Sequence, residues 1–273
     1  LTLKYGTPNA CAGCHKDKSD QWNWDEFKNL FGTVDSIHFS DKLVPGIVGE
    51  PGADKGLIEL INDLKQPEIV RASAVKALSK YDSEDLLDKF ILLLNDESPL
   101  VRGTTVDVLN QINTTDYVNY FLPLLNDSKR TVRVKAFYGL AGLTETQIPE
   151  KYKAPYQKVK LEFFDYLDIN LDFFGGQVRK GIYYLKQGNL QKAIECYEKA
   201  LKIDIINNQV RLDLANLYYR NQDYQKTEAA YKTVISQEPE YGPAYYSLGL
   251  LYAELEQTYE AIEHMQKANK LMP

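Results

Sequence analysis

Hydrophobic and polar positions along this chain repeat at two different intervals. Between residues 56 and 143 the interval is 31 positions, and from residue 174 onwards it is 34 positions. Within each interval, apolar residues stand three and four positions apart, which is the spacing of one face of a helix. Fixed intervals of this length indicate helical units stacked in a row. We therefore expect an all-α protein whose repeats form an α-α superhelix.

The 31-residue interval is carried by a valine-arginine pair and by the polar turn before it. The pair and the turn recur as Val70-Arg71, Val101-Arg102 and Val132-Arg133, and as Ile61-Asn62-Asp63, Leu94-Asn95-Asp96 and Leu125-Asn126-Asp127. The middle unit predicts two facing apolar stripes, formed by Leu86, Leu87, Phe90, Ile91 and Leu94 and by Val101, Val106, Val108 and Leu109. Each unit is expected to be two amphipathic helices around a turn. The pattern resembles HEAT repeats.

The 34-residue interval is carried by columns of small and aromatic residues. The columns comprise Gly181, Ala215 and Gly249; Tyr184, Tyr218 and Tyr252; Tyr197, Tyr231 and Met265; and Ala200, Val234 and Ala268. Small residues allow two helices to approach closely, and aromatic side chains fill the space between neighbouring repeats. The columns look like three tetratricopeptide (TPR) repeats. We attribute most of the chain's 20 tyrosines to this packing.

These patterns divide the chain into four segments. We predict a small irregular head over residues 1–50, HEAT-like repeats over 51–143 and three TPR repeats over 174–273. Between the repeats, residues 144–173 are expected to hold a proline-containing linker and an aromatic connecting helix that packs under the TPR repeats.

The head predicts one helix, capped by Ser19 and ended by Gly32. The apolar residues of this helix are Trp22, Trp24, Phe27, Leu30 and Phe31. Loop and turn signals follow, at His38, Pro45, Gly46 and Gly49. Such a short segment buries little core by itself. We therefore expect that the head needs a cofactor, or docking onto the first HEAT helices, to hold together.

Charge and hydropathy argue against two kinds of partner. The chain has 32 Lys and Arg against 38 Asp and Glu, a net charge of −6 without a basic cluster, so nucleic acid is not expected. No run approaches the ~18 apolar residues of a membrane span, so none is expected in this segment. The chain begins with Leu1 and has no recognisable signal sequence, which suggests a mature form or a segment of a longer chain.

One motif in the head carries chemistry. Cys11-Ala12-Gly13-Cys14-His15 is a C-x-x-C-H sequence, the attachment signature of c-type haem. In that chemistry two thiols bond the haem vinyl groups as thioethers, and the adjacent imidazole is an axial ligand of the iron. Cys11, Cys14 and His15 are therefore the candidate cofactor-binding residues. Cys196, the third cysteine, is expected to be a buried thiol on a TPR helix.

The residues around this motif are similar to a known family. Tyr5-Gly6-Thr7-Pro8-Asn9-Ala10 leads into the motif, and Lys16-Asp17-Lys18-Ser19 with Gln21-Trp22 follows it. Together with the repeats, this sequence resembles the C-terminal part of bacterial multihaem c-type cytochromes with tetratricopeptide repeats. The resemblance implies a periplasmic or otherwise exported protein, electron transfer, and further haem domains upstream in the full-length chain. This segment itself has one such motif.

The second iron ligand and the identity of the cofactor stay open. His38 is a candidate ligand of this or a neighbouring haem, and an open or water-ligated iron or an upstream histidine are alternatives. Zinc is another alternative cofactor, because Cys11, Cys14, His15 and His38 all offer zinc ligands. Against zinc, the adjacent Cys14 and His15 rarely face one small ion. A thioredoxin-like dithiol is disfavoured because no βαβ pattern surrounds the motif.

TPR arrays commonly bind an extended peptide along the concave face formed by the first helix of each repeat. That face is expected to present Val178, Ile182, Leu185, Leu212, Asn216, Tyr219, Arg220, Tyr246, Leu250 and Glu254. Val178 stands where a clamp for a terminal carboxylate needs a basic residue. We therefore expect a hydrophobic or aromatic peptide rather than an acidic tail. The alternative is that the connecting helix or another subunit covers these residues.

We expect an exported protein-interaction scaffold that carries a c-type haem and takes part in electron transfer. The alternative is a purely structural, protein-binding scaffold whose head is haem-free or binds zinc. The sequence has no Ser/His/Asp set, phosphate-cradling glycine loop or paired carboxylates that would indicate an enzyme. If the chain is produced in a cytoplasm, we expect haem to be absent.

Overall fold

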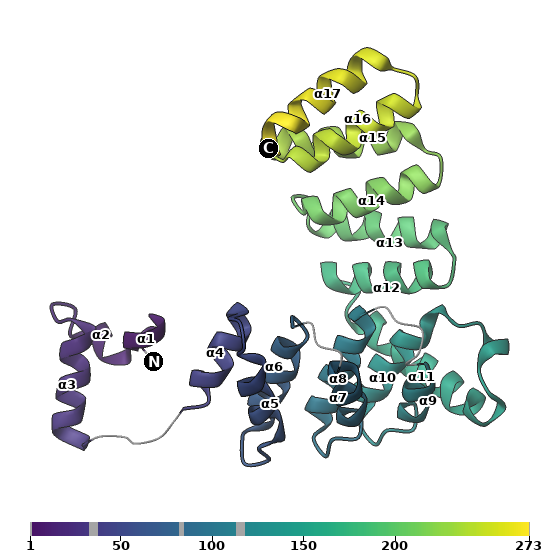
Figure 1. The fold of residues 1–273 in the computed structure, drawn as a ribbon. Coiled ribbons are helices and arrows are strands. Elements are labelled where there is room, and N and C mark those ends of the chain that lie inside the picture. Colours follow the sequence, from purple (N-terminus) through teal and green to yellow (C-terminus); the bar gives the residue numbers. More distant parts are fainter. Residues whose placement is uncertain (1, 33–37, 82–84, 113–117, 273) are drawn as a thin grey trace. The chain divides into compact units, whose positions relative to one another are not determined.

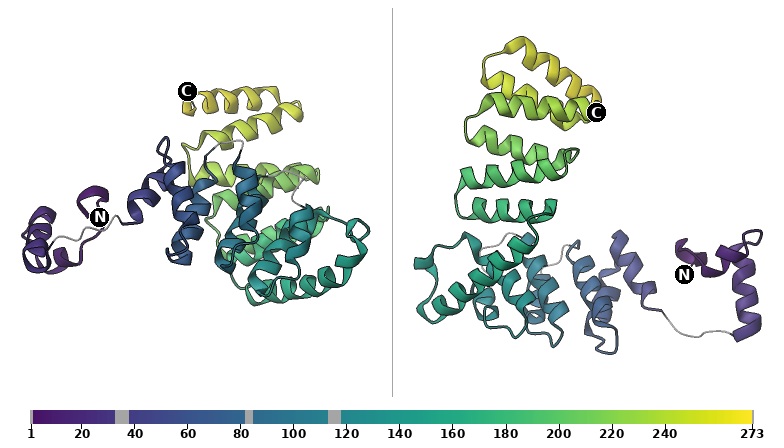
Figure 2. Two further views of the ribbon diagram at one scale, coloured as in Figure 1. Left: turned by 60° about the horizontal axis from the view of Figure 1, so that its bottom comes forward. Right: turned by 180° about the vertical axis from the view of Figure 1, so that it is seen from behind.

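The computed structural model describes residues 2–32, 38–81, 85–112 and 118–272. Every regular element in these ranges is a helix, which confirms the expected all-α fold. The chain divides into two units, residues 1–114 and 115–273, each of which is held together by its own contacts. Figure 1 labels the helices in chain order, and Figure 2 shows the ribbon from two further sides.

Within the described ranges, the helices of the first unit are α1 (Thr2–Tyr5), α2 (Ala10–Cys14), α3 (Asp20–Phe31), α4 (Ser40–Val48), α5 (Asp54–Asn62), α6 (Glu68–Leu78), α7 (Leu86–Leu93) and α8 (Pro99–Ile112). Helix α3 is the predicted head helix. The Ser19 hydroxyl caps it by accepting the N–H of Trp22 at 3.1 Å, and Gly32 ends it. Both α1 and α2 pack against α3.

The stretch after His38 is helical, where the sequence analysis expected loops and turns. Helix α4 contains Pro45 and packs against α5 and α6. Gly46 lies directly against the side chain of Leu57 in α5, so a Cβ atom at this position would clash. The expectation was wrong because proline and glycine disfavour a helix only locally. Here the glycine permits a close contact between helices, and this packing stabilises the helix.

Helices α5 and α6, and likewise α7 and α8, form the pairs predicted by the 31-residue interval. Most residues of the facing stripes are buried as expected, with Phe90 of α7 and Leu109 of α8 almost inaccessible, whereas Leu87 and Ile91 are half-buried. Arg71 is also buried. It donates through Nε to the carbonyl oxygen of Ile61 at 2.8 Å and is paired with the carboxylate of Asp96. A guanidinium group that is buried this deeply needs such pairing, because an unpaired buried charge is strongly destabilising. The repeated arginine and aspartate are thus the two ends of one contact between successive units.

The second unit begins with the last HEAT-like pair, α9 (Val118–Leu124) and α10 (Arg130–Gly139). Two 3-10 turns, η2 (Leu140–Gly142) and η3 (Glu145–Gln147), lead to the connecting helix α11 (Glu150–Ile169). Helix α11 includes Pro155, so it takes up part of the stretch that was expected to be a proline-containing linker. Arg133 donates to both carboxylate oxygens of Glu162 in α11 at 2.9 Å. Glu162 therefore has the same role toward Arg133 that Asp96 has toward Arg71.

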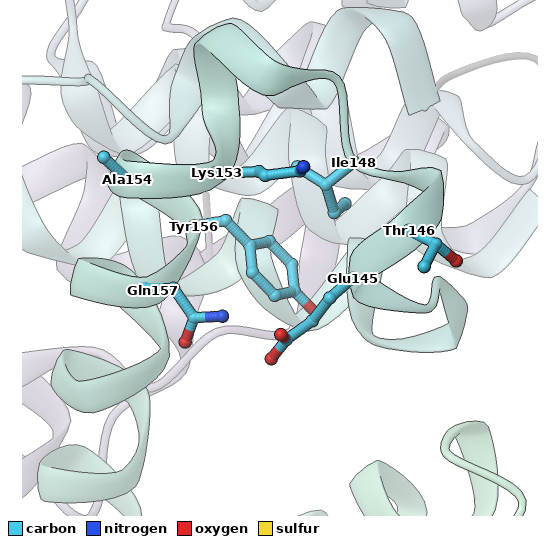
Figure 3. A pocket seen from close by; sticks show the side chains of 7 residues that line it. All are labelled: Glu145, Thr146, Ile148, Lys153, Ala154, Tyr156 and Gln157. Carbon is cyan, nitrogen blue, oxygen red and sulfur yellow. The ribbon is translucent and has the colours of Figure 1, made fainter.

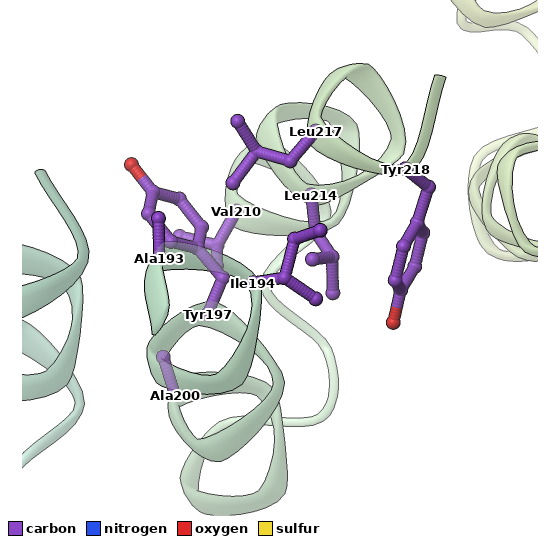
Figure 4. Packing of buried hydrophobic residues seen from close by; sticks show 8 residues of the cluster. All are labelled: Ala193, Ile194, Tyr197, Ala200, Val210, Leu214, Leu217 and Tyr218. Atoms are coloured by element: carbon purple, nitrogen blue, oxygen red, sulfur yellow. The ribbon is translucent and has the colours of Figure 1, made fainter. Parts of the chain in front are cut away.

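The TPR repeats are the hairpins α12 (Phe174–Lys186) with α13 (Leu190–Ile203), α14 (Asn208–Arg220) with α15 (Tyr224–Gln237), and α16 (Gly242–Glu254) with α17 (Thr258–Leu271). Each helix packs against the next one in the chain (Figure 2). A Cβ atom at Gly181 would lie 2.6 Å from the ring of Tyr197, which explains the small-residue column. Figure 4 shows Tyr197 in the core between α13 and α14, where Ile194 and Leu214 meet. The expected α-α superhelix of repeats is confirmed.

An aromatic cluster joins the connecting helix to the first TPR helix. The ring of Phe163 in α11 lies 5.2 Å from Phe137 of α10 and 5.3 Å from Tyr183 of α12. All three side chains are buried. At the end of α12, Lys186 donates to the carbonyl oxygen of Tyr138 at 3.2 Å. The last HEAT helix, the connecting helix and the first TPR helix therefore share one core.

Candidate functional site

The C-x-x-C-H motif lies on the short helix α2. The Asn9 side chain caps this helix by accepting the N–H of Cys11 at 3.0 Å, and the N–H of His15 donates to the carbonyl oxygen of Cys11 at 2.9 Å. Cys11 and Cys14 stand one helical turn apart, and both thiols are free and exposed. His15 is exposed directly after them. One helical turn and the residue that follows it therefore carry two accessible thiols and an accessible imidazole.

His15 contacts α3 through Trp22. The centroids of the two rings are 5.2 Å apart and their planes are inclined by 55°. The ammonium group of Lys18 lies 5.6 Å from the centre of the Trp22 ring, and the N–H of Lys18 donates to the carbonyl oxygen of His15 at 3.1 Å. Two residues of the turn that joins α2 to α3, His15 and Lys18, therefore contact the ring of Trp22.

A pocket of about 200 Å³ lies beside Cys11. It is lined by Thr2, Leu3, Asn9, Cys11, Asp20, Asn23, Trp24 and Phe27. Within residues 2–32, Asn23 is the one buried residue, with 4% of its surface exposed. Neither its amide nitrogen nor its amide oxygen has a hydrogen-bond partner among the described residues. An unpartnered buried polar group costs about 1–3 kcal/mol, so the burial of Asn23 is unfavourable for the head by itself.

The residues of the head fit a covalently bound haem. Both thiols are accessible, and the His15 imidazole forms no side-chain hydrogen bond within the described ranges. Trp24, Phe27 and Phe31 form an exposed row of rings whose centroids are 6.0 Å and 5.1 Å apart. Attachment of a large apolar group beside this row would remove apolar surface from water, and Asn23 would gain the chance of a polar partner.

His38 belongs to a different local arrangement. Its Nδ1 atom lies 2.8 Å from the hydroxyl of Ser40 at the start of α4, and its ring lies 4.1 Å from that of Phe39. In the described part of the chain, no three His, Cys, Asp or Glu side chains are grouped as ligands of a metal ion. The structure thus does not bring His38 into one set with the motif residues.

The predicted groove residues of the TPR repeats fall into two sets. Val178, Ile182 and Leu185 of α12 are half-buried and pack against the core between α13 and α14. Leu212 of α14 packs against the next core in the same way. The exposed set comprises Asn216, Tyr219, Arg220, Tyr246, Leu250 and Glu254. The surface open to a partner therefore lies on α14 and α16 rather than on all three first helices.

Polar contacts fix part of this exposed set. The Tyr231 hydroxyl donates to Oδ1 of Asn216 at 3.1 Å, and the Tyr219 hydroxyl donates to the carboxylate of Glu254. The bond to Glu254 raises the pKa of Tyr219 above its usual range. Tyr246 and Leu250 each remain 48% exposed. The result is an apolar and aromatic surface bordered by one positive and one negative side chain, which suits a hydrophobic segment of a partner.

A further pocket, of about 430 Å³, was not anticipated from the sequence (Figure 3). It lies between η3 and the first turns of α11, and its lining residues are Glu145, Thr146, Ile148, Lys153, Ala154, Tyr156 and Gln157. Burial raises the pKa of Tyr156 to about 12, and hydrogen bonds from Gln157 and Lys160 lower the pKa of Glu145. The sequence feature that could have indicated this pocket is the capping box formed by Thr144 and Gln147, which starts the turn η3.

Two residues that carry reactive groups are part of the TPR packing. Cys196 is buried as expected, and burial raises the pKa of its thiol. His264 lies against the rings of Tyr245 and Tyr252, and its Nδ1 is 2.8 Å from the carbonyl oxygen of Glu260. Neither lies near the C-x-x-C-H motif in sequence, and both are explained by helix packing.

Known repeat families match most of the chain beyond the head. The model of HEAT repeats matches residues 55–141, and models of the tetratricopeptide repeat match residues 177–204 and 212–271. In the described ranges, no helix combines the length and the apolar character that crossing a membrane requires.

Individual proteins are similar to parts of this chain. Superkiller protein 3 of Schizosaccharomyces pombe (strain 972 / ATCC 24843) is 36% identical over 98 residues, which cover 32% of this chain and 7% of that protein. Two crystal structures of MamA align with TM-scores of 0.41 and 0.38 at 15% and 14% identity. The alignments cover 70% and 80% of this chain, and 95% and 91% of the respective MamA chains. The family models and the helix pairs together identify this protein as one that carries HEAT repeats followed by tetratricopeptide repeats, as protein-interaction scaffolds do.

Proposed function

We propose that this protein is an exported interaction scaffold whose head binds a c-type haem covalently and takes part in electron transfer with partners held by the repeats. The proposal combines the C-x-x-C-H motif, the accessible thiols on α2 and the apolar pocket beside Cys11. A haem bound in this way supplies one-electron transfer. Covalent attachment of haem takes place outside the cytoplasm, so the proposal includes a periplasmic location.

The residues of the head have separate roles in this proposal. Cys11 and Cys14 would hold the haem through thioether bonds, and His15 would offer its imidazole to the iron. His38 is the proposed second ligand of this or a neighbouring haem, since Ser40 occupies its Nδ1 and leaves Nε2 for a metal. Leu3, Trp24 and Phe27 line the pocket beside Cys11 and would cover one side of the bound group.

The observation that carries the proposal is that the head buries a polar side chain and leaves most of its aromatic side chains exposed. A folded segment normally buries apolar side chains, whereas residues 2–32 bury a single polar one, Asn23, without a partner. Cys11 and the exposed rings of Trp24 and Phe27 line the same pocket as this residue, and the second exposed thiol, that of Cys14, is one helical turn from Cys11. A large apolar molecule with polar groups, attached through the thiols, accounts for all of these features together.

The test is production of the full chain in a periplasm together with a haem-maturation system. The wild type is expected to carry one covalent haem per chain, seen by mass spectrometry and by a c-type absorption spectrum. Cys11→Ala with Cys14→Ala should abolish attachment, and Cys196→Ala serves as the matched control that keeps it. A well-folded wild type without haem would contradict the proposal, and stoichiometric zinc in the same sample would favour the zinc alternative instead.

The repeats are proposed to hold the partner. The exposed apolar surface on α14 and α16 suits a hydrophobic or aromatic segment of another protein, or of an upstream haem domain of the same full-length chain. This part of the proposal stands apart from the haem, because the surface lies in the second unit and Cys11 lies in the first.

A further inference from the structure

The imidazole of His15 is held by one aromatic contact. Its backbone is fixed at the end of α2 by the bond to Cys11, but its side chain is exposed. The one ring contact of His15 among the described residues is with Trp22, at 5.2 Å between the centroids. Without that contact, rotation about the Cβ–Cγ bond would leave the plane of the imidazole undefined.

Trp22 is in turn fixed from two directions. Its N–H is bound by the Ser19 hydroxyl at the start of α3, so its Cα position follows from the helix cap. The Lys18 ammonium group lies against its ring. Trp22 is half-buried in this setting, whereas Trp24, two residues later, points into the pocket and contacts Phe27. The two tryptophans of α3 therefore have different tasks.

The orientation of a histidine ligand is commonly set by groups that contact the ring without touching the metal, and such groups tune the metal's potential. Most often the group is a hydrogen-bond acceptor for the second ring nitrogen. No such acceptor for His15 occurs in the described ranges, so the contact with Trp22 is the feature that can define the ring plane.

We propose that Trp22 is a positioning residue that sets the orientation of the His15 imidazole toward the iron. The inference rests on the proposed function, because it assigns a role to Trp22 at the same haem site. It goes further in naming a side chain outside the C-x-x-C-H motif that controls the properties of the bound iron.

The experiment compares Trp22→Leu, Trp22→Phe and the control Leu30→Ala. Leu30 is an exposed side chain on the same helix that lies outside the pocket. In the haem-free chain, NMR should show that Trp22→Leu moves the His15 ring-proton shifts, whereas the ring protons of His38 and His264 stay in place. Trp22→Phe should give an intermediate shift, and Leu30→Ala none.

In the haem-loaded chain, the readouts are the reduction potential and the EPR signal of the ferric state. Trp22→Leu should keep the covalent haem but shift the potential and broaden the EPR signal, because the imidazole samples several orientations. Trp22→Phe should restore most of the wild-type values. Unchanged NMR shifts, or a wild-type EPR signal and potential in Trp22→Leu, would overturn the inference while the proposed function stands. A wild type that takes up no haem overturns both.

Discussion

The head and the TPR repeats use aromatic side chains in opposite ways. In α12–α17, tyrosines such as Tyr197 and Tyr231 are buried against small residues of the neighbouring helix. In α3, the rings of Phe27 and Phe31 contact each other but remain exposed, and the one buried residue is Asn23. The comparison teaches that a TPR repeat obtains its core from the next repeat, whereas the short head buries almost no apolar side chain of its own.

The largest effect is expected in the core shared by α10, α11 and α12. Phe163→Ala removes a fully buried ring, so the free energy of unfolding should fall by about 3–5 kcal/mol. Urea unfolding followed by circular dichroism measures it. Leu161→Ala, at an exposed position of the same helix, should change it by less than about 0.5 kcal/mol.

The same variant separates the head from the repeats. Both tryptophans of the chain are in α3, so tryptophan fluorescence reports on the head alone. Phe163→Ala should displace the circular dichroism curve and leave the fluorescence curve in place. Equal displacement of both curves would mean that the head and the repeats unfold as one body, which would contradict the comparison.

Alkaline pH is expected to weaken the TPR repeats. Burial raises the pKa of Tyr197 from 10.0 to about 12, which means that the folded state favours the neutral phenol. The resulting stability is fully present below pH 10 and is lost as the pH rises from 10 to 12. At full ionisation the loss corresponds to roughly 2–3 kcal/mol. Tyr197→Phe should become steadily more stable relative to the wild type over this range in urea titrations. A constant difference would show that this phenol does not ionise with unfolding.

Asn23→Leu is expected to act in opposite directions with and without haem. In the haem-free chain it removes an unpartnered buried amide, so the head should gain about 1–2 kcal/mol by tryptophan fluorescence. In the haem-loaded chain, where the amide gains a partner, the gain should disappear, as monitored by haem absorbance in urea. Asn29→Leu, on the exposed side of α3, is the control for helix propensity. An equal gain in stability in both forms would contradict a role for Asn23 at the haem site.

The smallest effect on stability is expected at the exposed surface of α14 and α16. Leu250→Ser changes a half-exposed side chain, so unfolding should shift by less than about 0.5 kcal/mol. Binding of synthetic hydrophobic-aromatic peptides, measured by fluorescence anisotropy, should nevertheless weaken several-fold, because an apolar contact at the centre of the surface is lost. Leu92→Ser, an exposed leucine of α7, is the matched control. Preference for acidic peptides over aromatic ones would contradict the assigned surface.

Much of the fold can be predicted from the sequence because the residue types that form a given contact recur at the same position in each repeat. The Gly181 and Tyr197 columns predict a close contact, and the structure has it. Helix α4 was missed because Pro45 and Gly46 are helix breakers by themselves. Packing against α5 and α6, including the contact of Gly46 with Leu57, stabilises the helix in this stretch. Within the site, the C-x-x-C-H motif was readable because its chemistry requires a fixed spacing. Asn23 gave no signal, since burial of a single amide has no pattern along the chain.

The sequence by itself determined the helical repeats, their periods, the cap of α3 and the motif residues, because each of these depends on neighbours a few positions away or on a repeated interval. Only the tertiary structure decided that α11 supplies Glu162 to Arg133 and that α12 shares a core with the last HEAT pair. It also decided that Trp22 rather than Trp24 meets His15. Each of these contacts involves a segment that occurs once in the chain, either α11 or the head. No periodicity in the sequence therefore predicts them, and packing in three dimensions selects them.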